Sequence, residues 1–143
     1  MFSIRDHFYF SMSSKAALSI LVKAVSSHAF VPIVLHMDAT YKLNVNEFPV
    51  LILGLSDAQQ QFHLLSISVM SHHTEAQYRE VLHAFKRVIM HVVPDINFSP
   101  QYVMTDCDVA ERYSVFCVPY LDMYSTSVYV ICFVTSLSSW PHI

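Results

Sequence analysis

The segment Val31-Pro-Ile-Val-Leu-His-Met-Asp38 places an aspartate at the end of a largely apolar run that is typical of a buried strand. A second segment, Tyr102-Val-Met-Thr-Asp106, repeats this arrangement later in the chain. An ionised carboxylate close to a core loses solvation and needs a metal ion, a partner or water in compensation. Two acids in equivalent positions therefore suggest one shared ion.

The chain between these two acids predicts a mixed α/β fold. After a strand at 30–38, apolar runs at 49–56 and 61–70 are separated by short polar connections, which is the pattern of an antiparallel meander. A helix is expected next, and the run 101–105 then forms a fourth strand. The only candidate for a fifth strand is 127–134.

The strongest helix signal follows the third strand. Thr74-Glu-Ala-Gln77 has the form of a capping box, and apolar residues then recur from Tyr78 to Val92 at the spacing of one helix face. Gln77 is assigned to the polar side of this helix, and Pro94 closes it. A second, shorter helix is expected over 14–26 as part of a lead-in to the fold.

This order of elements brings the two aspartates together. A strand that returns to its sheet through a helix lies parallel to its neighbour, so the carboxyl ends of the first and fourth strands would meet at one edge. Asp38 and Asp106 would repel each other there unless a divalent cation such as Mg²⁺ or Mn²⁺ bridged them. The alternative is that each acid caps a turn or a helix, and Asp106 is suited to cap a helix beginning near residue 107.

Composition limits the class of protein. The chain of 143 residues has the length of a single domain, and with 54% hydrophobic residues it can bury a sizeable core. A net charge of -3 excludes an overall basic character, so contact with nucleic acid would need a local patch. The cysteines Cys107, Cys117 and Cys132 have no C-x-x-C spacing and fit a reducing compartment. No signal peptide, membrane span or membrane partner is expected, which leaves the nucleus or the cytoplasm.

Four blocks of the sequence, His36–Lys42, Phe48–Asp57, His73–Leu82 and Val103–Asp106, resemble the MULE (Mutator-like element) transposase domain. The resemblance implies a ribonuclease H-like fold with a D-D-E metal site, in which Asp38 matches the first acid and Asp106 the second. It also implies Mg²⁺ or Mn²⁺ as cofactor, transposon ends as the DNA partner, and phosphodiester hydrolysis with strand transfer as the activity. The resemblance is also compatible with a homo-oligomer of this chain. Residues 1–29 would be a helical lead-in and 30–143 a partial catalytic domain.

The third acid of the family is a glutamate on a helix well beyond the second aspartate. No acidic residue follows Asp122 here, and Asp108 and Glu111 are too close to Asp106 to replace that glutamate. The sequence therefore predicts a fragment that cleaves DNA weakly or not at all by itself. One alternative is a catalytically inactive, transposon-derived module that binds DNA or protein. Another is an unrelated α/β domain whose aspartates cap helices.

Overall fold

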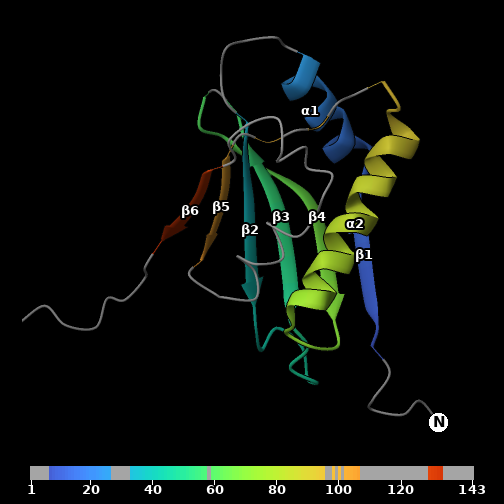
Figure 1. The fold of residues 1–143 in the computed structure, drawn as a ribbon, viewed down its shortest axis with the longest axis vertical. Coiled ribbons are helices and arrows are strands. Elements are labelled where there is room, and N and C mark those ends of the chain that lie inside the picture. Colours follow the sequence, from blue (N-terminus) through green and yellow to red (C-terminus); the bar gives the residue numbers. More distant parts are fainter. Residues whose placement is uncertain are drawn as a thin grey trace, which may run out of the picture.

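The structure is a computed structural model that describes residues 7–26, 33–57, 59–95, 98, 100, 102–106 and 129–133. Within these ranges, two helices and six strands follow one another along the chain. They are β1 (Tyr9–Ser13), α1 (Lys15–Ser26), β2 (Val34–Thr40), β3 (Val50–Ser56), β4 (Phe62–Met70), α2 (Glu75–Val92), β5 (Tyr102–Asp106) and β6 (Tyr129–Phe133). The strands form one sheet in the order β1-β4-β3-β2-β5-β6 (Figure 1).

Both kinds of strand pairing occur in this sheet. The neighbours β1, β4, β3 and β2 pair antiparallel, whereas β5 pairs parallel with β2 and β6 pairs parallel with β5. The predicted meander, helix and parallel fourth strand are thus confirmed, and the arrangement is compatible with a ribonuclease H-like fold. The strand β1 was not predicted from the sequence. It joins the outer side of β4, directly before the helix expected near residues 14–26.

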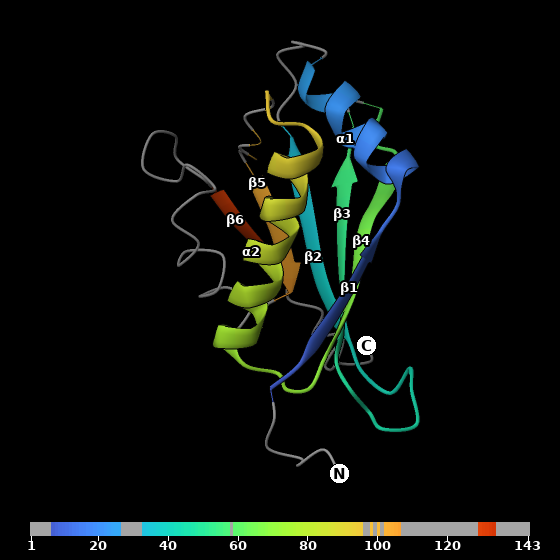
Figure 2. The same ribbon diagram turned by 90° about the vertical axis from the view of Figure 1, so that its right-hand side faces the viewer.

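Helices α1 and α2 contribute to one core with a single face of the sheet. Figure 2 shows α2 lying along that face, with β1 at the sheet edge nearest the viewer. Alternate residues of the central strands point into the core, as do one side of α2 and the start of α1. The cluster includes Leu18, Leu21, Leu35, Met37, Leu51, Leu53, Leu55, Tyr78, Val81, Phe85, Ile89 and Val103. The described residues place no helix on the opposite face, which we call the open face.

The start of α2 differs from its predicted form in one respect. Thr74 is the N-cap, as expected, and its side chain accepts a hydrogen bond from the backbone N–H of Gln77. Gln77 itself is only 2% exposed, so its assignment to the polar side was wrong. Its amide donates to the carbonyl of Phe8 at 3.0 Å and to Ser71 Oγ at 2.8 Å, and it accepts from the N–H of His72 at 2.6 Å. These partners satisfy the buried amide, which the helical pattern alone does not reveal.

The apolar stripe of α2 is also narrower than its sequence indicates. Five of the predicted apolar positions are buried, namely Tyr78, Val81, Leu82, Phe85 and Ile89. In contrast, Val88 is 42% exposed and Val92 is 51% exposed. The sheet therefore covers only the centre of the predicted apolar face.

A β-bulge changes the alternation of side chains along β4. The register of β4 with β3 shifts between Leu53 and Gly54 of β3. On β4 itself, the consecutive residues Leu65 and Ser66 are both buried. A Cβ atom on Gly54 would collide with Cε2 of Phe62, so the Phe62 ring occupies the space above the glycine. This is the only glycine of the chain, and the positive φ angles of the described residues belong to Lys42, Glu47 and Gln60.

The turn between β3 and β4 is organised by Asp57. One of its carboxylate oxygens accepts hydrogen bonds from the N–H groups of Gln59 and Gln61, each at 2.9 Å. The other lies 2.7 Å from Nε2 of His63. The hydrogen bond with His63, followed by those from the backbone, lowers the pKa of Asp57 below its usual value of 3.8.

We predict that Gln77→Ala lowers the free energy of unfolding by about 2–4 kcal/mol, because it empties the space of a buried side chain and removes three partly buried hydrogen bonds to Phe8, Ser71 and His72. Urea denaturation followed by circular dichroism measures this loss. Arg79→Ala is the control on the same helix, because it removes a partly exposed pair with Glu75 and should cost less than about 1 kcal/mol. Equal effects of the two substitutions would contradict the role given to Gln77.

We also predict a pH-dependent contribution from Asp57. A carboxyl whose native pKa lies below its unfolded value stabilises the native state above the unfolded value, and loses this effect as the pH falls through the native value. The difference in stability between the wild type and Asp57→Asn should therefore be constant well above pH 3.8 and shrink below it. Urea denaturation over a pH series provides the measurement. A difference independent of pH would exclude this contribution of the charge.

Candidate functional site

The two predicted acids lie on neighbouring parallel strands. Met37 of β2 is in register with Thr105 of β5, so the next residue along each strand is an aspartate, Asp38 or Asp106. Adjacent strands are about 4.8 Å apart. The predicted parallel pairing of the two acid-bearing strands is thus confirmed, and it brings the two residues together.

Both aspartates are on the open face. Met37 and Thr105 are buried on the helix side, and successive side chains of a strand point to opposite faces. Asp38 is exposed and Asp106 is half-buried. The open face therefore carries two carboxylates that are accessible from solvent in different degrees.

Asp38 does not end its strand as the sequence suggested. The strand β2 continues to Thr40, because β3 extends the antiparallel ladder to the pair formed by Thr40 and Val50. Asp106 is the last residue of β5. The pair of acids thus lies on the sheet surface close to the carboxyl ends of both strands, rather than in a loop beyond them.

A histidine, His36, shares the open face with Asp38, as expected for two residues two positions apart on a strand. His36 Nε2 is 2.6 Å from Ser56 Oγ on β3, and its ring meets that of Phe62 edge-on, with a centroid distance of 5.6 Å. Partial burial lowers the pKa of His36 below 6.5, which favours the neutral ring. The contact with Ser56 was not apparent from the sequence, since it depends on the register of β2 with β3.

The described residues contain no group of three or more His, Cys, Asp or Glu side chains arranged to hold a metal ion. Within this part of the chain, Asp38 and Asp106 are therefore a pair and not a triad. The residues Cys107, Asp108, Glu111 and Cys117 lie outside the described ranges, as does the helix that Asp106 was suited to cap. Cys132 belongs to β6, in register with Thr105.

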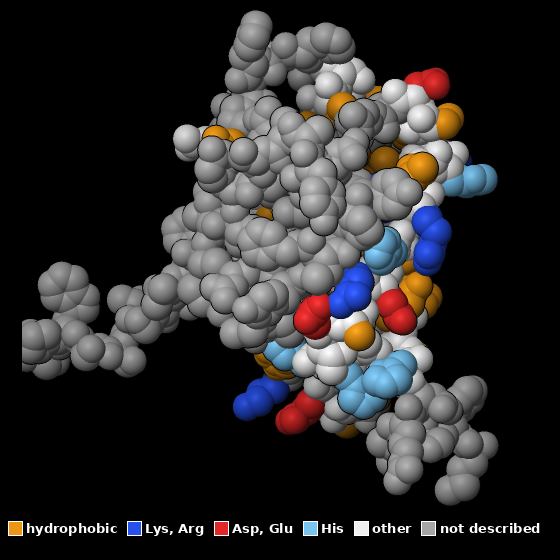
Figure 3. All heavy atoms as spheres, in the orientation of Figure 1, with side chains coloured by type: hydrophobic (Ala, Val, Ile, Leu, Met, Phe, Trp, Pro, Cys, Tyr) orange, Lys and Arg blue, Asp and Glu red, His pale blue; other side chains and the backbone are white. Residues whose placement is uncertain are grey.

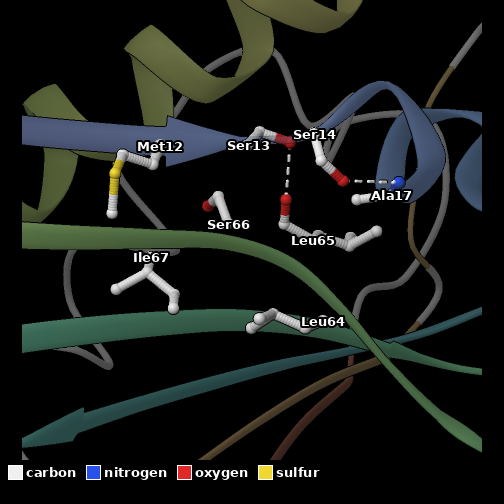
Figure 4. Close-up of a pocket in the computed structure, with 8 residues that line it drawn as sticks. All are labelled: Met12, Ser13, Ser14, Ala17, Leu64, Leu65, Ser66 and Ile67. Carbon is white, nitrogen blue, oxygen red and sulfur yellow. Dashed lines mark hydrogen bonds between the residues drawn. The ribbon is translucent and has the colours of Figure 1, made fainter.

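A hollow of about 220 Å³ lies elsewhere, where β1 turns into α1 (Figure 4). Ser13 donates a hydrogen bond to the carbonyl of Leu65 at 2.6 Å, and Ser14 Oγ accepts one from the N–H of Ala17 at 3.0 Å. These bonds fix the turn and cap α1. None of the described residues that line this hollow is acidic, and neither Asp38 nor Asp106 is among them.

The family model for the MULE transposase domain matches residues 34–133, from the first residue of β2 to the last residue of β6. The chain belongs to this family. The MULE domain contains both aspartates, whereas β1 and α1 precede the matched residues. No curated protein matches the chain. None of the helices in the described part of this MULE domain is long and apolar enough to cross a membrane.

Proposed function

We propose that this MULE domain is the catalytic domain of a Mutator-like DNA transposase with a ribonuclease H-like fold. Asp38 and Asp106 would hold Mg²⁺ or Mn²⁺ beside a DNA phosphodiester, as the first two acids of a D-D-E site. The observation that carries this proposal is the parallel register of β2 and β5, which aligns both acids on one face. A transposase-type function agrees with membership of the family.

The chemistry of the two side chains fits such an ion. Carboxylate oxygens favour hard cations, and Mg²⁺ is usually held by one or two carboxylates together with water and phosphate oxygens. Two aligned aspartates meet that need without a nitrogen or sulfur ligand. When bound, a divalent cation stabilises charge on phosphate oxygens and lowers the pKa of a coordinated water. Asp38 and Asp106 themselves position the cation and neutralise its charge.

The surroundings of the pair suit an extended substrate. Asp38 is exposed on a face that carries no described helix, so a phosphodiester approaching from that side meets a carboxylate directly. His36, which shares this face, is engaged by Ser56 and favours its neutral form. We assign no catalytic role to it. The ends of a transposable element are the proposed DNA partner.

A second candidate function is a transposon-derived module that binds DNA or protein without catalysis. It is favoured by the lack of a third acid beside the pair among the described residues. The same two aspartates would then bind a cation loosely, and the open face would serve for binding alone. The two candidates differ in whether the pair supports cleavage.

We predict that the wild-type chain binds Mn²⁺ weakly and that Asp38→Asn and Asp106→Asn each weaken binding at least about tenfold, because each removes a charged ligand. Isothermal titration calorimetry measures this. Asp57→Asn is the matched control, since Asp57 lies in the turn between β3 and β4. An unchanged heat for Asp38→Asn would remove the site altogether.

We further predict that this chain alone cleaves a labelled DNA duplex slowly or not at all in Mn²⁺. Any cleavage above background should disappear in Asp38→Asn and Asp106→Asn, because both acids belong to one site. Cleavage that persists in Asp106→Ala would contradict the assignment. Gel-shift measurements on the same duplex separate the catalytic domain from the non-catalytic binding module. A binding module forms the DNA complex in the wild type, Asp38→Asn and Asp106→Asn alike and gives no cleavage product in any of them.

A further inference from the structure

The outer strand β1 has backbone groups that no strand of the sheet uses. The N–H of Ser71 donates to the carbonyl of Phe8 at 3.0 Å, which makes Phe8 and Ser71 a hydrogen-bonded pair of the antiparallel ladder. Such pairs alternate along the ladder, so Phe10 and Met12 also bond to β4. The N–H and carbonyl groups of Tyr9, Ser11 and Ser13 must then point away from β4.

The close contact between Ser11 and Ser68 agrees with this assignment. Their hydroxyl oxygens are 2.7 Å apart, and side chains approach most closely at the pairs that lack backbone hydrogen bonds. Three residues of β1 therefore present a row of donors and acceptors at the sheet edge. Figure 2 shows no described helix or strand in front of this edge.

The sequence of β1 carries none of the usual protection of an edge strand. Natural edges are blocked by charged residues, proline or bulges, whereas Tyr9-Phe-Ser-Met-Ser13 contains no charge and no proline. On the open face, Phe10 is 59% exposed and Met12 is 53% exposed. An edge with this composition is suited to pairing with another strand.

The side chains of α2 next to β1 indicate where the partner strand comes from. Glu80, His83 and Arg87 line a groove of about 370 Å³ with Tyr9, and Ala84 lines a hollow of about 230 Å³ with Ser11. Glu80 precedes Ala84 by four residues and Arg87 follows it by three, so opposite charges flank a small residue beside the centre of β1. Figure 3 shows acidic, basic and histidine side chains interspersed along this side of the molecule.

We propose that β1 pairs antiparallel with β1 of a second copy of this chain, around a two-fold axis at Ser11. Tyr9 of one copy then bonds to Ser13 of the other, and Ser11 bonds to its own counterpart. Phe10 lies beside Met12 of the other copy on the open face, in a pair without backbone bonds whose side chains approach closely.

The same axis passes close to Ala84, because Ala84 and Ser11 line one hollow. It therefore brings Glu80 of each copy toward Arg87 of the other. Both the strand and the charges are self-complementary, which a two-fold interface requires. Glu80 and Arg87 are exposed and form no ion pair with any described residue of their own copy. The free edge of β1 and the charges on α2 thus both fit a second copy of the chain as the binding partner.

Sedimentation equilibrium of the full chain over micromolar concentrations tests this proposal. We expect a monomer–dimer equilibrium in the wild type. Ser11→Pro should raise the dimer Kd roughly 25-fold, because two hydrogen bonds are lost per dimer and each contributes a factor of about five. Ser11→Ala is the matched control, since it removes the hydroxyl but keeps the N–H, and it should retain the dimer. A monomer at every concentration, or equal Kd values for Ser11→Pro and Ser11→Ala, would overturn the proposal.

Charge exchange on α2 tests the interface without changing β1. Glu80→Arg and Arg87→Glu should each raise the dimer Kd severalfold, because like charges then face each other. The double variant should restore a Kd close to that of the wild type. Absence of this rescue would exclude the proposed two-fold axis. Self-association that is insensitive to all of these variants would assign the contact to another surface and equally refute the proposal.

Discussion

The parallel ladder between β2 and β5 is the constraint on which the rest of this domain depends. It fixes Met37 beside Thr105 on the helix side, and thereby Asp38 and Asp106 side by side on the open face. Because side chains alternate along a strand, a slip of one residue would turn one aspartate toward the core. The same slip would bring an apolar residue to the surface. Burial of the core and alignment of the acids are thus enforced by one register.

Much of this arrangement could be predicted from local patterns. The apolar runs and the capping signal at Thr74 gave the order of strands and helix, and the crossover rule then gave the parallel pairing that unites the acids. The pairing of β1 could not be predicted, because a short run of aromatic and serine residues has no clear period. Gln77 and the bulge in β4 also escaped prediction. Both depend on partners that are distant in sequence, which a pattern along one segment does not contain.

The two faces of the sheet differ in composition and in burial. The helix side is mainly aliphatic and aromatic, with a few buried polar side chains such as Gln77 and Thr105, and it supplies the burial that stabilises the domain. The open face combines the carboxylates with the His36–Ser56 contact and with exposed apolar side chains of β1 and β4. Exposed side chains on this face can therefore vary without disturbing the packing of the core.

The position of the single glycine has a consequence for the loops. Gly54 lies within a strand beneath the Phe62 ring, while Lys42, Glu47 and Gln60 adopt the left-handed backbone conformation that side chains disfavour. Each of these three residues holds its turn at a conformational cost of about 1 kcal/mol. The loops at the ends of the sheet are thus sites where thermal stability can be improved by introducing glycine, with no change to either face.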